Sequence, residues 1–243
     1  MQRFVRSLLG RDRSPASVAP ELPSAIAVVP EGLRMAEDWD RRAREDARWH
    51  IASDVTNDEE FATTGRRDVD VALGPLDDAW LRDARALEIG CGTGRMTEFL
   101  LRRVRALDAI DVSSEMIERA RDRLGDRPNL RLLATSGRDL APFADDSFEL
   151  VLSYVVLQHI PNAICRLYFR EIRRVLQAGG VFRGQVARIT APGFQQPSDH
   201  DSFSMRSWSL EELRAEFEHW GSAQFEVNPV TATTDHIWIT ARS

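Results

Sequence analysis

The chain has 243 residues, 43% of them hydrophobic and 29% charged, which suits one globular domain with a short appendage and disfavours a second full domain. No stretch reaches the roughly 18 uninterrupted apolar residues of a membrane span, and the first residues lack the features of a secretory signal, so we expect a cytoplasmic protein. The formal net charge of −6 disfavours a nucleic-acid partner, because neutralising phosphates requires clustered Lys and Arg.

The cysteine content limits the redox and metal chemistry. Cys91 and Cys165 are the only cysteines, and Cys91 lies inside a glycine-rich segment. One pair cannot supply a disulfide framework or a cysteine-based metal site. We therefore expect two reduced thiols and no metal.

The first 80 residues divide into two parts by composition. Residues 1–32 are rich in Pro, Ala and Ser, which favours a flexible leader. A short amphipathic helix near its start, touching a membrane or a partner, is the alternative. Within 33–80, apolar residues recur at helical spacing from Met35 to Ser53, and a second helical stretch lies between Val69 and Leu76. We expect these two helices to form a cap before the core domain, 81–243.

From residue 84 onward, short apolar runs alternate with helical periodicity. Strands separated by helices of this length require crossover connections, which give a parallel sheet covered on both faces. The sequence therefore predicts a doubly wound α/β fold. The expected strands are Ala84–Ile89, Ala106–Asp111, Leu130–Ala134, Phe148–Ser153 and Gly180–Val186, and the expected helices are Met96–Arg105, Ser114–Leu124 and Ala163–Leu176.

The C-terminal end has a different pattern. A helix is expected at Leu210–Trp220, with Ser209 as its N-cap and two glutamates in its first turn. Two strands follow, Gln224–Val227 and His236–Thr240, joined by a loop too short for a parallel crossover. We therefore expect this last pair to be antiparallel.

A glycine-rich turn, Glu88 to Gly94, lies between the first expected strand and the following helix. Its three glycines permit left-handed dihedrals and close approach of a ligand to the main chain. Dinucleotide-binding proteins use a related turn, but their fingerprint requires Gly or Ala where this chain has Arg95. Asp111 ends the second strand, where an acidic side chain can meet both ribose hydroxyls of a nucleoside on this turn. The spacing indicates a nucleoside site of another kind.

These features together resemble the class I S-adenosylmethionine-dependent methyltransferases, over roughly residue 82 to the end of the chain. The resemblance implies S-adenosylmethionine as cofactor and a mostly parallel, Rossmann-like sheet of seven strands whose last hairpin supplies the antiparallel strand. The segments that carry the resemblance are Leu87–Gly94, Ile110–Ile117, Pro142–Val151 and Arg174–Gly180.

The resemblance also assigns cofactor-binding residues. Glu88 and the glycine backbone would lie beside the methionine part, Asp111 would hold the ribose and Met116 would flank the adenine. Where the family often has an acidic residue for the adenine amino group, this chain has Gly137, so either Asp139 or a backbone group near Arg138 takes that role. The complete implied set is Glu88, Gly90, Cys91, Gly92, Gly94, Asp111, Val112, Met116, Gly137, Arg138, Asp139 and Ser153.

Each of these assignments has a structural alternative. Glu88 could cap backbone amides of the turn, Asp111 could be the N-terminal cap of the next helix, and Met116 could be core. Their joint occurrence, in order and at the family's spacing, favours the cofactor.

The acceptor side is predicted from position. His159 follows the fourth strand at the carboxyl edge of the sheet, where ligands of such folds bind, so it is the candidate general base. It could instead only shape the pocket. The long loop Thr190–Trp208 is typical of a substrate-facing insertion. The expected acceptor pocket comprises Trp39, Tyr154, Gln158 and His200.

We therefore expect methyl transfer from S-adenosylmethionine to an oxygen or nitrogen of a small or medium-sized acceptor, such as a secondary metabolite, a lipid-linked compound or a sugar. The alternative is a non-catalytic protein that binds the cofactor or serves as a scaffold. Methylation of RNA or protein lacks support, because the chain has no basic stripe with interleaved aromatic residues. The sequence leaves the oligomeric state open.

Overall fold

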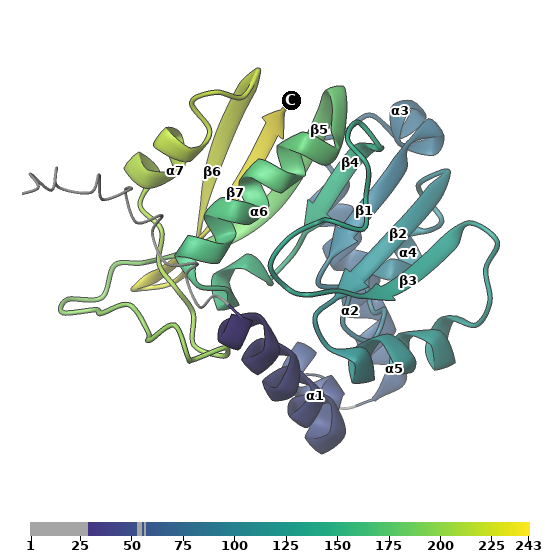
Figure 1. Cartoon of the computed structure of the whole chain (residues 1–243), viewed down its shortest axis with the longest axis horizontal. Coiled ribbons are helices and arrows are strands. Elements are labelled where there is room, and N and C mark those ends of the chain that lie inside the picture. Colours follow the sequence, from purple (N-terminus) through teal and green to yellow (C-terminus); the bar gives the residue numbers. More distant parts are fainter. Residues whose placement is uncertain (1–28, 53–54, 56) are drawn as a thin grey trace, which may run out of the picture.

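The computed structural model describes residues 29–52, 55 and 57–243, with side chains from Arg34 onward. The predicted leader lies mostly outside this range, and helix α1 already begins at Val29, inside the segment expected to be flexible. Figure 1 shows a central sheet with helices on both faces and α1 below one edge.

The sheet has seven strands in the order β3-β2-β1-β4-β5-β7-β6. Neighbouring strands from β3 to β5 are parallel, and β7 runs antiparallel to both β5 and β6. This confirms the predicted doubly wound, mostly parallel seven-stranded fold with an antiparallel end. The strands are β1 (Arg85–Ile89), β2 (Ala106–Asp111), β3 (Leu130–Ala134), β4 (Phe148–Ser153), β5 (Leu176–Ile189), β6 (Ser222–Thr231) and β7 (Thr234–Arg242).

The helices follow the predicted order, with several differences. The short helix α3 and the turn η1 were not predicted, α2 begins at Asp58 rather than near Val69, and the helix expected at Met96–Arg105 is reduced to α4. Around α4 several amides bond to the carbonyl three residues back, such as Arg102 N to Phe99 O, so the segment coils as tight turns. The helices are α1 (Val29–Ile51), α2 (Asp58–Leu73), α3 (Asp78–Asp83), α4 (Thr97–Leu100), α5 (Ser114–Leu124), the 3-10 turn η1 (Leu157–His159), α6 (Asn162–Val175) and α7 (Leu210–Glu216).

Helix starts coincide with polar caps in the sequence. Ser113 caps α5 by accepting from the Met116 amide at 3.0 Å. The expected Ser209 cap of α7 is a complete capping box: the Ser209 hydroxyl accepts from the Glu212 amide, and the Ser209 amide donates to the Glu212 carboxylate. These local bonds fix where each helix begins and therefore how the preceding loop leaves the sheet.

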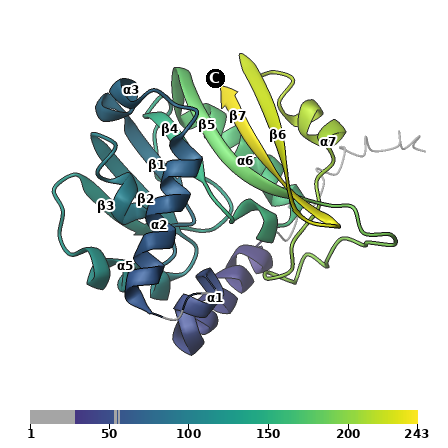
Figure 2. The ribbon, with the colours of Figure 1, turned by 180° about the vertical axis from the view of Figure 1, so that it is seen from behind.

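Two hydrophobic layers cover the sheet. One contains α6 and α7 with residues such as Phe169 and Phe217 (Figure 1). The other contains α2, whose Val69, Ala72 and Leu73 pack with sheet residues (Figure 2). The expectation that α2 belongs to a separate cap is therefore wrong: its apolar side is buried against the sheet.

Helix α1 lies over the carboxyl ends of the strands, beside α5 (Figures 1 and 2). Its helical path is interrupted at Asp46, which has an extended backbone (φ −164°, ψ 90°) and accepts from the Trp49 amide at 3.0 Å. Asp40 ties α1 to α5, because its carboxylate accepts from the Ser113 hydroxyl at 2.5 Å and from the Glu115 amide at 3.0 Å. The helix thus covers the edge of the sheet where ligands of such folds bind.

None of the helices formed by the described residues combines the length and apolar character of a membrane span. Within the same part of the chain, no group of three or more His, Cys, Asp or Glu side chains is arranged to hold a metal ion.

Candidate active site

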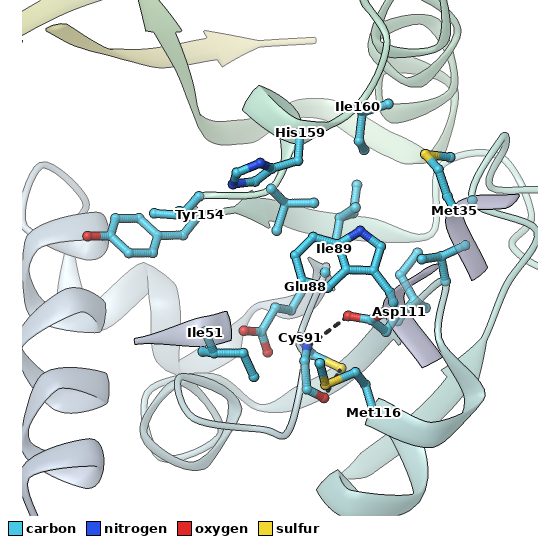
Figure 3. Close-up of a pocket in the computed structure, with 18 of the residues that line it drawn as sticks. Met35, Ile51, Glu88, Ile89, Cys91, Asp111, Met116, Tyr154, His159 and Ile160 are labelled. Atoms are coloured by element: carbon cyan, nitrogen blue, oxygen red, sulfur yellow. Dashed lines mark hydrogen bonds between the residues drawn. The ribbon is translucent and has the colours of Figure 1, made fainter. Parts of the chain in front are cut away.

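A cavity opens at the carboxyl ends of β1, β2 and β4, beneath α1 (Figure 3). Its empty volume is about 1080 Å³ including the solvent at its mouth. Figure 3 shows the side chains of Glu88 and Asp111 entering from the strand ends, with His159 opposite them and Met35 and Ile51 of α1 on either side. The cavity is therefore lined jointly by the sheet, the loop after β1 and α1.

The loop after β1 requires its glycines. Gly90, Gly92 and Gly94 have φ of +78°, +52° and +81°, a region that side chains disfavour. A Cβ on Gly90 would lie 2.3 Å from Val156 Cγ2. Gly90 and Gly92 line the cavity together with Cys91, as the predicted site requires. Gly94 does not line it, because its α-carbon faces Leu124 and holds the loop against α5.

Glu88 ends up buried at the base of the cavity. The Thr97 hydroxyl donates to its Oε2 at 2.7 Å, so Glu88 is held by a side chain, in contrast to the suggested capping of loop amides. Burial raises the pKa of Glu88 to about 7, an effect that the Thr97 hydrogen bond and the charge of Arg95 only partly offset. A carboxyl with this pKa can bind as either the acid or the carboxylate near neutral pH.

Asp111 lies at the end of β2 and lines the same cavity. Its two oxygens accept from the Gly92 and Ser113 amides, each at 2.9 Å, so it joins the glycine loop to the start of α5 (Figure 3). The N-cap of α5 is Ser113, which makes the alternative role of Asp111 as that cap wrong. Burial raises the pKa of Asp111, and the amide hydrogen bonds oppose the rise.

The predicted adenine side of the cavity is only partly assembled from the expected residues. Val112, Met116 and Gly137 line it. Met116 is also core, since it packs with residues of α1, and its place beside the adenine stays a prediction. Asp139 does not line the cavity; its carboxylate accepts from the Ser136 hydroxyl and the Ala141 amide. Arg138 also lies outside the lining.

His159 lines the cavity on η1 and is neutral. Its Nδ1 lies 2.6 Å from the Phe203 carbonyl oxygen and must carry the proton that it donates, which leaves Nε2 to accept from the Gln158 side-chain amide at 3.3 Å. Burial lowers the pKa of His159 to about 4. Its ring lies edge-on to Trp39 at 6.0 Å and stacks with Phe203 at 6.1 Å. Both ring nitrogens thus have partners in the protein, and the geometry fits a side chain that shapes the pocket better than a strong base.

The other predicted pocket residues separate into two groups. Trp39 and Tyr154 line the cavity. Ser153, Gln158 and His200 do not. The Ser153 hydroxyl donates to the Ile89 carbonyl and joins β1 to β4, Gln158 is buried beside His159, and His200 is bonded to Arg34 at 2.6 Å. These three are placed by the fold to support neighbouring segments.

His50 and Arg95 are lining residues that the sequence did not single out as part of the site. His50 follows the interruption of α1 at Asp46, and its buried Nδ1 has no hydrogen-bond partner among the described residues. Burial lowers the pKa of His50, so it too is a neutral imidazole at pH 7. Both residues stood in segments already noted, the cap helix and the position after the glycine loop. The remaining unpredicted lining residues are Met35, Ile51, Ile89, Met96, Ile110, Thr135, Val155, Val156, Ile160 and Tyr168.

The loop between β5 and α7 packs on α1 above the cavity. The Ser202 hydroxyl donates to Asp38 at 2.8 Å and accepts from Arg42 at 3.0 Å, which pins the loop to α1. Phe203 then contacts His50, with ring centroids 5.8 Å apart, as well as His159. We call Trp39, His50, His159 and Phe203 the aromatic roof, of which the first three line the cavity while Phe203 packs on the two histidines.

The sequence is similar to those of known methyltransferases. Residues 87–183 match the family model described as a methyltransferase domain. The chain is 36% identical over 129 residues to a malonyl-[acyl-carrier protein] O-methyltransferase of Halorhodospira halophila, covering 50% of this chain and 41% of that protein. It is 32% identical over 101 residues to a ubiquinone biosynthesis O-methyltransferase of Xanthomonas oryzae, covering 41% of each. The chain thus spans less than half the length of these two relatives.

Solved structures share the fold. Phosphoethanolamine N-methyltransferase 1 of Haemonchus contortus, in complex with phosphoethanolamine and S-adenosylhomocysteine, matches with a TM-score of 0.64 at 16% identity, covering 87% of this chain and 49% of that one. The DhpI–SAH complex matches with a TM-score of 0.56 at 20% identity, covering 86% and 95%. The matched segment spans the glycine loop, Asp111 and His159, which contribute to the cavity. Residues 87–183 therefore carry a methyltransferase domain, and the chain shares the fold of the solved methyltransferase structures.

Proposed function

We propose that the protein is an enzyme that transfers a methyl group from S-adenosylmethionine to an oxygen or nitrogen of a small or medium-sized acceptor. The main support for this proposal is the cavity, in which the glycine loop and two buried carboxyl groups, Glu88 and Asp111, meet beneath α1. A secondary metabolite, a lipid-linked compound or a sugar fits this proposal as the acceptor.

The residues of the cavity suit this cofactor. Glu88 can accept from the ammonium group at the methionine end, and Asp111 can accept from ribose hydroxyls next to the loop. Val112, Met116 and Gly137 offer an apolar surface for adenine. When bound, S-adenosylmethionine supplies an electrophilic methyl group on a sulfonium. The work left to the protein is to align the acceptor and to exclude water, and alignment can be worth about 7–11 kcal/mol.

Among the described residues, no charged side chain lines the end of the cavity opposite the glycine loop. The charged side chains that line the cavity within the described chain are Glu88, Arg95 and Asp111, all on the side of the glycine loop. The aromatic roof, with neutral His50 and His159, faces the other side. A weakly basic histidine suits an acceptor atom with an available lone pair, such as a neutral amine, a carboxylate or an acidic hydroxyl. The names of the relatives support both oxygen and nitrogen.

A non-catalytic or differently acting protein is the second candidate. One solved structure with this fold is described as the [4+2]-cyclase SpnF, matching with a TM-score of 0.57 at 16% identity. The fold alone therefore does not impose methyl transfer. The intact pair of Glu88 and Asp111 favours cofactor binding, and turnover separates the two candidates.

The test incubates the purified full chain with S-adenosylmethionine labelled in its methyl group and a metabolite extract. We expect label in an extractable small molecule, and no label when Asp111→Ala replaces the wild type. A protein that binds the cofactor but transfers no label to any fraction would favour the non-catalytic candidate. Absence of cofactor binding would contradict both.

A further inference from the structure

Arg42 of α1 lies at the rim of the cavity. Its guanidinium carbon is 5.3 Å from the ring centroid of Trp39, which lines the cavity, and 4.9 Å from that of Phe203, which is 40% exposed. A group in contact with one lining ring and one exposed ring lies where the cavity meets the surface. Arg42 is not itself a lining residue, so it can meet only the outer part of a ligand.

The Arg42 side chain is largely buried, yet part of its guanidinium is free. The side chain is 12% exposed, and its Nη1 donates to the Ser202 hydroxyl at 3.0 Å. Within the described chain, Nε and Nη2 have no hydrogen-bond partner, and neither is among the fully enclosed polar atoms, so both remain in contact with solvent. Since a guanidinium carries five N–H donors, Arg42 has donors to offer to a ligand.

In the described part of the chain, no carboxylate is hydrogen-bonded to Arg42. Asp38 Oδ2 lies 3.9 Å from Nη1, beyond hydrogen-bond distance. The Asp38 carboxylate is already engaged by other donors, the Arg41 guanidinium at 2.9 Å and the Ser202 hydroxyl at 2.8 Å. Asp38 is therefore shared between two arginines and is bonded directly to only one of them.

Two further carboxylates, Asp201 and Glu45, act on Arg42 through their charge. Both have donors of their own: Glu45 accepts from Arg41 at 3.4 Å, and Asp201 accepts from two backbone amides of its own loop at 2.8 Å each. Burial lowers the pKa of Arg42, and the nearby carboxylates offset only part of this change. An anionic ligand at the rim would supply the missing compensation.

The positive charge of Arg42 also acts on the aromatic roof. Burial is the main cause that lowers the pKa of His50 and His159, and Arg42 lowers both further. Arg206 adds to this effect at His159, but it is 2% exposed and held by backbone carbonyl oxygens, so it acts only through its charge. At each histidine the largest effect of a charged group is that of an arginine, so the roof favours a negative group over a positive one. The opposing carboxylates are Glu45 and Asp46 at His50, and Asp201 at His159.

We propose, resting on the proposed function, that the acceptor carries a carboxylate or a phosphate at its outer end, and that Arg42 binds this group at the rim while the atom to be methylated lies inside the cavity. Both groups present oxygen atoms that match the planar fork of a guanidinium. The acceptor is therefore an elongated molecule with an uncharged inner part and an anionic outer end. Arg42 selects the acceptor and takes no part in binding the cofactor.

The first test fractionates the acceptor by charge. A metabolite extract is passed over a strong anion exchanger at about pH 7, where carboxylates and phosphates are ionised. The full chain is then incubated with methyl-labelled S-adenosylmethionine and either the unbound or the retained fraction. We expect more label with the retained fraction. Phosphatase treatment of that fraction then identifies a phosphate if transfer falls and a carboxylate if transfer persists, and either result supports the inference.

Two other results of this test would be negative, and they differ in what they overturn. More label with the unbound fraction than with the retained fraction would overturn the anionic acceptor while leaving the proposed function intact. No label with either fraction or with the whole extract would overturn the proposed function and this inference together.

The second test replaces Arg42. In Arg42→Gln, the amount of retained fraction that gives half-maximal transfer should rise about 10- to 100-fold, because a charge-assisted contact is lost. In the wild type this amount should increase with NaCl concentration, and in the variant the dependence should nearly disappear. The affinity for S-adenosylhomocysteine should stay unchanged. The same half-saturating amount and salt dependence in both proteins would overturn the inference.

The controls separate the charge of Arg42 from its contact with the loop. Ser202→Ala removes the hydrogen bond to Nη1 but keeps the charge, so the salt dependence should remain. Its loss in Ser202→Ala would show that Arg42 only holds the loop, which would overturn the inference. Arg44→Gln changes an exposed arginine of the same helix and should match the wild type. If Arg42→Gln does not fold, Arg42→Met keeps an aliphatic stem on the two rings and is measured instead.

Discussion

Glu88 and His159 face the same cavity, and burial shifts the pKa of each side chain in the direction that favours its neutral form. Burial raises the pKa of the Glu88 carboxyl to about 7 and lowers the pKa of the His159 imidazole to about 4. Desolvation disfavours the charged form in both cases, so the acid tends to hold its proton and the base tends to lack one. The same physical cause therefore moves the two pKa values in opposite directions.

Glu88 should make cofactor affinity and stability respond to pH in opposite directions. A protonated Glu88 cannot accept from the ligand ammonium, so the affinity for S-adenosylhomocysteine should increase between pH 6 and pH 8. The pKa of Glu88 is raised from 4.5 in a free carboxyl to about 7, so the stability it contributes is full below pH 4.5 and is lost as pH rises through 7. Calorimetry between pH 6 and pH 8 checks the affinity, and thermal unfolding between pH 4.5 and pH 7 checks the stability. Glu88→Gln should flatten both dependences, and unchanged slopes would contradict this role.

His159 should contribute no step to the pH profile in the neutral range. Since its pKa of about 4 keeps it neutral from pH 5 upward, the profile of kcat/KM should have no inflection near 6.5 that disappears in His159→Gln. The variant should instead raise the KM for the acceptor, because the roof loses a ring that contacts Trp39 and Phe203. A neutral-range inflection that the substitution removes would show that His159 acts as a general base.

At the scale of elements, the contact of α1 with α5 decides whether the cavity is covered. Asp40 accepts two hydrogen bonds at the N-terminus of α5, where the helix dipole favours a negative charge. Asp40→Ala should weaken this docking by about 1–2 kcal/mol. Hydrogen exchange in α1 should accelerate, while exchange in β1 stays unchanged. Glu37→Ala, an exposed residue on the same helix, is the matched control. Equal exchange in the two variants would contradict the docking role.

The elements that could be predicted from the sequence are those defined by local periodicity and caps. The bounds of β2, β4 and α5 agree with the expectation because their apolar runs end at polar or capping residues. Strand β5 was expected to begin at Gly180, yet it starts at Leu176. Its pairing with β4 shifts register between Phe148 and Leu150, so the glycines form an irregularity within the strand rather than a turn before it.

The same distinction applies to the site. Glu88, Asp111 and their loop were predictable because strand ends and a glycine turn bring them together over a short stretch of chain. His50 and Phe203 reach the roof only because α1 changes direction at Asp46 and the loop after β5 folds back onto it. The Arg95 side chain is held by an ion pair with Asp68, 27 residues earlier in the chain. These placements depend on tertiary packing, which neither periodicity nor spacing reports.

At the scale of the whole molecule, the cavity joins segments that are far apart in the sequence. The sheet edge, the glycine loop, α1 and η1 each contribute to its lining. A ligand that fills the cavity contacts all of them and should stabilise the native state, by about 2.7 kcal/mol at 100 times its Kd. Ligand-induced stabilisation would thus report on the assembled cavity rather than on one segment.

The most direct test of this account is calorimetric titration of the full chain and of its Asp111→Asn variant with S-adenosylhomocysteine. We expect one equivalent to bind the wild type, and the Kd of a folded variant to be about 10- to 100-fold higher, because the substitution removes the negative charge that we propose to face the ribose. No binding to the wild type, or equal affinity of the two proteins, would contradict the assignment of this cavity to the cofactor.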